Sequence, residues 1–153
     1  MPGTFSQIYI QTVFAVKGRN SLIQPEWEEN LYRYMTGIVQ NKEQKMLAIN
    51  GTPDHIHFLI GMRPPCSLSD LVREIKKSSN EYIKENNFTK FNFNWQEGYG
   101  AFSYSHSQLD NVIGYIRNQK EHHKKQTFKE EYFDFLKKFN IAFEEKYLCE
   151  WIE

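Results

Sequence analysis

A turn signal between two short apolar runs constrains the fold of this chain more than any other feature. Gly51-Thr52-Pro53-Asp54 separates residues 45–50 from residues 55–62, and glycine, proline and aspartate within four residues favour a tight turn. We therefore predict an antiparallel hairpin. Its second strand opens with His55 and His57, which project from one face because strand side chains alternate between faces. Their imidazoles can converge on a single metal ion.

The segments around this hairpin predict an α+β fold. Residues 6–16 are rich in β-branched and aromatic side chains and indicate a strand, as do residues 101–105. We expect helices after Pro25, after Ser67, from about Gln108 to Lys124 and over residues 128–139. Strand, helix, hairpin, helix, strand, helix is the order of a split β-α-β sheet with helices packed on one face.

Length and composition indicate one soluble domain, residues 1–153, which is large enough to bury a core without disulfides. Cys66 and Cys149 fit no zinc or disulfide spacing, so we expect reduced thiols in a cytoplasmic protein. We find no charged and apolar leader, and no apolar stretch reaches the roughly 18 residues that span a bilayer. The 19 basic residues balance 19 acidic ones, which argues against coating of nucleic acid through bulk charge.

A second pair of candidate residues lies in the helix expected from Gln108. Tyr115 and Gln119 are four residues apart and share a helical face. With the histidine pair, they offer two nitrogen ligands, an amide oxygen and a phenol, which indicates metal-assisted attack by tyrosine. This mixed donor set is compatible with Mg²⁺ or Mn²⁺. His122 and His123 follow, either as auxiliary ligands, as phosphate contacts or as part of a solvated helix end.

Three motifs in this order resemble the small tyrosine transposases of bacterial insertion sequences, which belong to the HUH superfamily of single-strand nucleases. They are His55-Ile56-His57, the segment from Asn94 to Ser103, and the segment from Tyr115 to His123. The resemblance runs from about Phe5 to Phe139. It implies a ferredoxin-like or RRM-like antiparallel sheet with a C-terminal helix that carries the nucleophilic tyrosine.

The resemblance also implies a reaction and its residues. It implies cleavage and rejoining of single-stranded DNA with hairpin ends at insertion-sequence termini, through a 5′-phosphotyrosine on Tyr115. His55, His57 and Gln119 would bind a divalent metal. The family acts as a homodimer, commonly with each tyrosine docked into the histidine pair of the other subunit.

Basic residues form two candidate contacts with the DNA backbone. Arg73, Lys76 and Lys77 lie on the second helix, and Arg117 and Lys120 flank the candidate nucleophile. Solvated helix faces are the alternative. Two other functions stay open: a domesticated protein that binds or processes palindromic DNA hairpins without transposing, and a phosphodiesterase whose histidines activate water.

Overall fold

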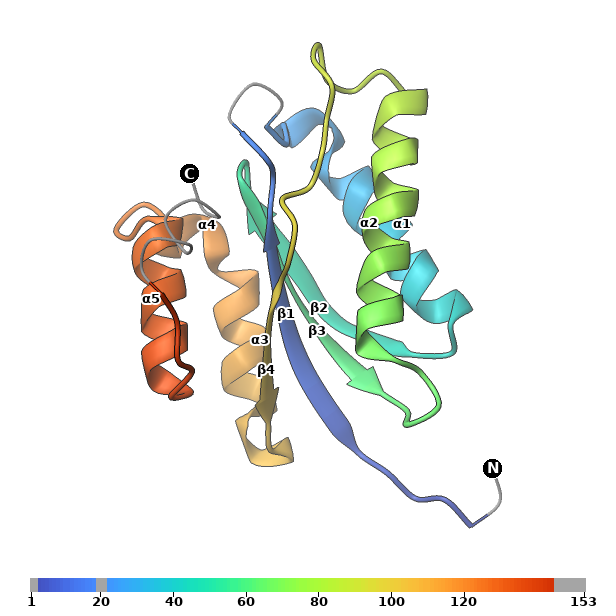
Figure 1. Ribbon diagram of the computed structural model, residues 1–153, viewed down its shortest axis with the longest axis vertical. Helices are drawn as coiled ribbons and strands as arrows, with labels where there is room; N and C mark the ends of the chain where they lie inside the picture. The colour runs from blue at the N-terminus through green and yellow to red at the C-terminus, as the bar shows by residue number, and fades with distance from the viewer. Residues whose placement is uncertain (1–2, 19–21, 145–153) are drawn as a thin grey trace.

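A four-stranded antiparallel sheet forms the centre of the computed structural model, which describes residues 3–18 and 22–144 (Figure 1). The strands lie in the order β2-β3-β1-β4. Their bounds are β1 Ile8–Ala15, β2 Lys45–Thr52, β3 His55–Met62 and β4 Gly100–Tyr104. The α+β prediction is therefore confirmed, and β2 and β3 form the predicted hairpin around Pro53 and Asp54. Cys149 lies outside the described residues.

Two helices cover one face of the sheet, α1 (Pro25–Asn41) and α2 (Leu68–Glu85). Pro25 occupies the first turn of α1, and Ser67 caps α2 through the backbone N–H of Asp70. The main core lies between these helices and the sheet. Its largest fully buried side chains include Phe14, Phe58, Leu31, Met35 and Ile75.

The opposite face is covered by the C-terminal helices (Figure 1). These are α3 (Leu109–Arg117), α4 (Gln119–His122) and α5 (Phe128–Lys138), and a short 3₁₀ turn, His106–Gln108, precedes α3. The prediction of one continuous helix to Lys124 was wrong, because the helix breaks at Asn118. At the break, the Asn50 amide of β2 donates to the carbonyl of Arg117, 2.9 Å away. A side chain of the sheet thus binds a backbone carbonyl that would otherwise accept a hydrogen bond within a continuous helix.

The strand register determines which side chains lie under the C-terminal helices. His57 pairs with Val13 of β1, and the neighbouring positions on this face of β1 and β4 include Gln11 and Tyr104. Because side chains alternate, both histidines point to the face that carries α3, α4 and α5. None of the helices in the described part of the chain is long and apolar enough to span a membrane.

Candidate metal and tyrosine site

The tight hairpin places both histidines inside the protein. A Cβ on Gly51 would lie 2.3 Å from the carbonyl oxygen of His55, so the two strands approach where only glycine fits. His55 and His57 each have 0% exposed area. Their rings pack against Phe128 and Phe135 of α5 respectively. The pair predicted at the start of a strand is therefore enclosed by the C-terminal helices.

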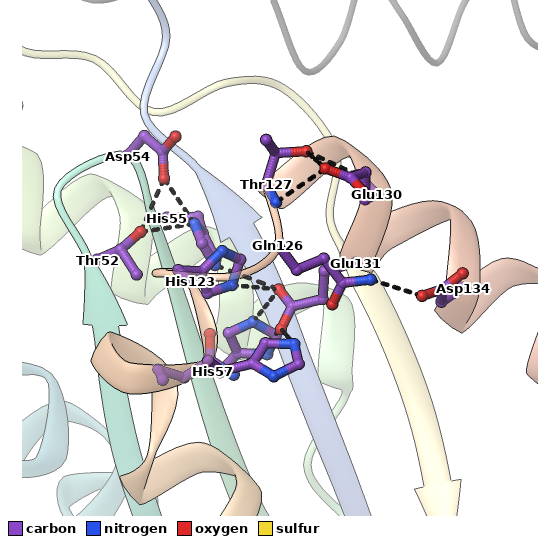
Figure 2. Close-up of polar contacts among 12 residues, drawn as sticks. Thr52, Asp54, His55, His57, His123, Gln126, Thr127, Glu130, Glu131 and Asp134 are labelled. Atoms are coloured by element: carbon purple, nitrogen blue, oxygen red, sulfur yellow. Dashed lines mark hydrogen bonds and ion pairs between the residues drawn. The ribbon is translucent and has the colours of Figure 1, made fainter.

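The carboxylate of Glu131 in α5 lies at the centre of a histidine cluster (Figure 2). His57 Nε2 hydrogen-bonds to Glu131 Oε1 at 2.8 Å. His123 Nε2 and His55 Nε2 lie 3.0 and 3.3 Å from the same oxygen, at ion-pair distance but without hydrogen-bond alignment. Three imidazoles from β3 and the end of α4 thus converge on one carboxylate oxygen.

Tyr115 and Gln119 meet the other oxygen of this carboxylate. The Tyr115 hydroxyl donates to Glu131 Oε2, and the Gln119 amide donates to the same atom at 3.1 Å. The centroid of the Tyr115 ring lies 5.9 Å from that of His57. The break at Asn118 leaves both side chains directed at the cluster. The structure therefore brings together all four residues that the sequence singled out.

The backbone turn also orients His55. Asp54 Oδ1 lies 2.6 Å from His55 Nδ1, so the ring donates its Nδ1 proton to the carboxylate, and Nε2 faces the cluster. Thr52 Oγ1 lies 2.8 Å from the same nitrogen and donates to Asp54. Burial would raise the pKa of Asp54, but the hydrogen bond and charge of His55 lower it to about 2.

Burial and the shared carboxylate set the charges of the site. Burial lowers the pKa of His57 to about 4, so this ring is neutral at pH 7. Burial would raise the pKa of Glu131, but its contacts with His123, His55 and His57 hold it below the ordinary value. Burial and the negative charge of Glu131 raise the pKa of Tyr115. The phenol therefore keeps its proton beside an ionised carboxylate.

The arrangement fits a divalent metal ion. Ligand atoms of His55, His57, His123 and Glu131 lie within 4.8 Å of one another. Within the described chain, His55 Nε2, His123 Nε2 and Gln119 Oε1 are buried polar atoms without a hydrogen-bond partner. Buried polar atoms in this state are costly unless a ligand or ion satisfies them. Each of them is a metal donor type.

The sequence reasoning missed Glu131 as part of this site and left His123 open. One signal for Glu131 was present: it lies three residues after Phe128 and four before Phe135, on the apolar face of α5. A carboxylate on a buried helix face requires a partner. His123 carried no such signal, because its contacts depend on how the turn after α4 folds back.

The basic candidates divide into two groups. Lys76 donates to the carbonyls of Gln96 and Gly98, at 2.8 and 2.6 Å, and burial lowers its pKa to about 8. Lys120 likewise holds Asn50 and Glu28 of its own chain, at 2.9 and 3.2 Å. These two lysines therefore tie elements of the fold together.

The other three basic candidates are exposed, as Lys120 also is. Arg73 is exposed and ion-paired with Asp70, while Lys77 and Arg117 are exposed. Arg73 and Lys77 line a cleft of about 600 Å³ between α2 and the segment from Asn94 to Tyr99. Arg73, Lys77 and Arg117 thus differ from Lys76 and Lys120, whose ammonium groups bind other elements of the fold.

Comparisons with known proteins find one matching family and solved structures of similar fold. Residues 4–119 match the family model described as "Transposase IS200 like". A presumed transposase from Deinococcus radiodurans R1, known from its crystal structure, aligns with a TM-score of 0.61 and 20% identity, covering 78% of this chain and 95% of that one. A REP-associated tyrosine transposase, solved bound to a REP hairpin, aligns with a TM-score of 0.61 and 16% identity, covering 80% of this chain and 73% of that one. No curated protein matches the chain significantly. The family match ends at Gln119, before His123 and Glu131.

Proposed function

Because the chain belongs to the IS200-like transposase family, we propose that it cleaves and rejoins single-stranded DNA through a 5′-phosphotyrosine on Tyr115. One observation carries this proposal. The Tyr115 hydroxyl and the His57 imidazole bind opposite oxygens of the same Glu131 carboxylate, in a cluster that fits a metal ion. The proposed nucleophile and the candidate metal site thus contact the same carboxylate, each through one of its two oxygens.

The residues suggest how the reaction proceeds. In cleavage, the phenol oxygen of Tyr115 forms a bond to phosphorus, the bond from phosphorus to the 3′ oxygen breaks, and that oxygen takes up a proton. Glu131 Oε2 already accepts the hydrogen bond of the phenol, so the departing phenol proton has an acceptor in place. The new ester conserves the energy of the broken bond, so a free 3′-hydroxyl can later displace Tyr115 and join strands.

The donor set indicates which metal ions suit the site. We propose His55, His57 and Gln119 as ligands, with His123 and Glu131 available to the same ion. A bound divalent ion would neutralise charge on the phosphoryl oxygens of the scissile phosphate. Mg²⁺ prefers oxygen ligands, whereas a set with two or three imidazoles suits Mn²⁺ and other transition metals better. Of the two ions expected from the sequence, Mn²⁺ is therefore the better candidate.

The proposed substrate is single-stranded DNA with hairpin ends. A structural relative was solved with a REP hairpin bound, which supports a hairpin as the recognised form. Arg73 and Lys77 at the cleft beside α2 are candidate contacts to the DNA backbone, and Arg117 is a candidate contact at the nucleophile. We also propose that the protein acts as a homodimer that shares its active sites.

The test is to trap the covalent intermediate. Purified protein is incubated with Mn²⁺ and labelled single-stranded oligonucleotides that cover the DNA flanking the gene, including any imperfect palindrome found there, and adducts are resolved on a denaturing gel. We expect an adduct that requires the metal and disappears in Tyr115→Phe, because only the hydroxyl is lost, while hairpin binding stays within a few-fold. Tyr34→Phe, which alters an exposed tyrosine on α1, is the control and should leave the adduct unchanged.

Three results would overturn the assignment. An adduct that survives in Tyr115→Phe would mean that another residue is the nucleophile. Cleavage that proceeds through free products, without any adduct in the wild-type protein, would favour metal-activated water and therefore a phosphodiesterase. Hairpin binding without cleavage in any divalent metal would instead favour the domesticated binding protein.

A further inference from the structure

A buried glutamine of β1, Gln11, is hydrogen-bonded to the histidine cluster. Gln11 has 0% exposed area, and its amide nitrogen lies 2.9 Å from Nδ1 of His57. The hydroxyl of Tyr104 in β4 donates to the amide oxygen of Gln11 at 2.8 Å. The three residues form a hydrogen-bonded row from β4 through β1 to β3, on the face of the sheet that carries the site.

The direction of every hydrogen bond in this row follows from chemistry. An ionised carboxylate only accepts, so His57 donates its Nε2 proton to Glu131. The neutral ring then has a lone pair on Nδ1, and this lone pair accepts a proton from the amide nitrogen of Gln11. The amide oxygen of Gln11 faces Tyr104, which donates to it. Each group has a partner in this arrangement.

The same arrangement is incompatible with metal binding through His57 Nε2. A ligating nitrogen must offer its lone pair, so the single proton of a neutral imidazole has to lie on Nδ1. With the amide as described, that Nδ1 proton would face the N–H of Gln11, donor against donor. His55 does not have this conflict, because Asp54 accepts its Nδ1 proton and leaves Nε2 free.

We propose that Gln11 is the positioning residue that sets the tautomer of His57, and that its amide turns by about half a rotation when a metal ion binds. The turned amide presents its oxygen to His57 Nδ1–H and its nitrogen to the oxygen of Tyr104. The proton count of His57 does not change, since the proton moves from Nε2 to Nδ1. This inference rests on the proposed metal site, because only a ligand at Nε2 requires the second tautomer.

The metal-free protein supplies the first test, by ¹⁵N NMR of its imidazoles. The chain has five histidines, and the signals of His57 are identified by their absence in His57→Gln. We expect the proton of His57 on Nε2 without metal, and on Nδ1 after saturation with Zn²⁺, used as a diamagnetic probe. A proton on Nδ1 already in the metal-free protein, or on Nε2 after Zn²⁺ is bound, would overturn the proposal.

Variants of Gln11 supply the second test, by calorimetric titration with Mn²⁺. Gln11→Met keeps the length of the side chain but cannot accept a proton, so the affinity for Mn²⁺ should fall by about 10- to 100-fold. Gln11→Glu can only accept at this position, so it should bind Mn²⁺ at least as tightly as the wild type and carry a proton on His57 Nδ1 even without metal. This gain-of-function variant separates positioning from general damage to the fold.

Gln44→Met provides the matched control. Gln44 is also buried, but it binds Arg63 and Lys42 beyond the other end of β3, so its loss should leave Mn²⁺ affinity unchanged. Equal affinity of wild type and Gln11→Met would refute the role of Gln11. A wild-type protein that binds neither Mn²⁺ nor Zn²⁺ would refute the metal site itself, so the two failures are distinguishable.

Discussion

At the residue scale, the site depends on one carboxylate that six side chains contact, His122 among them at 3.7 Å from Glu131 Oε2. Glu131 meets three imidazoles through Oε1 and the phenol and amide of Tyr115 and Gln119 through Oε2. Burial and the charge of Glu131 raise the pKa of Tyr115, the proposed nucleophile, while the carboxylate oxygens contact the proposed metal ligands. A cation bound to the cluster would offset that charge, which couples metal binding to activation of Tyr115.

The pair formed by Asp54 and His55 predicts a dependence of stability on pH. The pKa of Asp54 is about 2 in the folded protein, below the ordinary aspartate value of 3.8, so the folded state favours the ionised form. The pair therefore stabilises the protein fully above about pH 4, and this contribution is lost as pH falls through about 2. Half of the Asp54 side chain is exposed, so after discounting for solvent screening we expect about 1 kcal/mol at pH 6 and about half of that at pH 3.

The measurement compares wild type with Asp54→Asn by urea unfolding in the presence of a chelator. The difference in the free energy of unfolding should shrink between pH 6 and pH 3. A difference that stays constant over this range would show that the charge of Asp54 does not contribute through His55.

At the element scale, the β2-β3 hairpin and the break between α3 and α4 together form the site. The hairpin carries both histidines and Asn50, and Asn50 binds the carbonyl of Arg117 where the helix ends. Lys120 at the start of α4 returns to Asn50 and to the carbonyl of Gly51. The hairpin therefore positions the segment from Tyr115 to His123 as well as its own ligands.

Glycine at position 51 should consequently be required. In Gly51→Ala, the new Cβ would meet the His55 carbonyl at 2.3 Å, so the strands must separate, and we expect a loss of roughly 2–4 kcal/mol in the free energy of unfolding. Gly37→Ala in α1 is the control, since nothing lies within 4 Å of its Cβ position. It should be neutral or stabilise by about 0.5–1 kcal/mol. Equal stability of the two variants in urea would contradict the close approach of the hairpin strands.

At the scale of the whole molecule, the C-terminal helices form a unit that is linked to the sheet through residues 105–108. Within the described chain, this unit brings Tyr115 to the histidine pair of the same subunit. Exchange of the unit between two copies would preserve the same contacts, and a short linker favours such exchange. The homodimer with shared sites predicted from the sequence is compatible with this geometry.

Mixed dimers test the sharing of sites. If the units are exchanged, heterodimers of inactive Tyr115→Phe and inactive His55→Ala subunits contain one site with all groups intact, so adduct formation should recover. Differently tagged chains first establish that subunits mix. No recovery after proven mixing, or a monomer by light scattering at micromolar concentration, would instead leave each site within one chain.

The sequence by itself determined the strands and the hairpin, because these follow from local alternation and turn residues, and it singled out His55, His57, Tyr115 and Gln119 through their spacing together with the family resemblance. Only the tertiary structure decided the rest. The break at Asn118 depends on Asn50, which is distant in the sequence. Glu131, His123 and Gln11 belong to the site because the turn after α4, the packing of α5 and the register of β1 bring them there. Local patterns carry no information on such long-range contacts, since these form only when the faces of separate elements pack together.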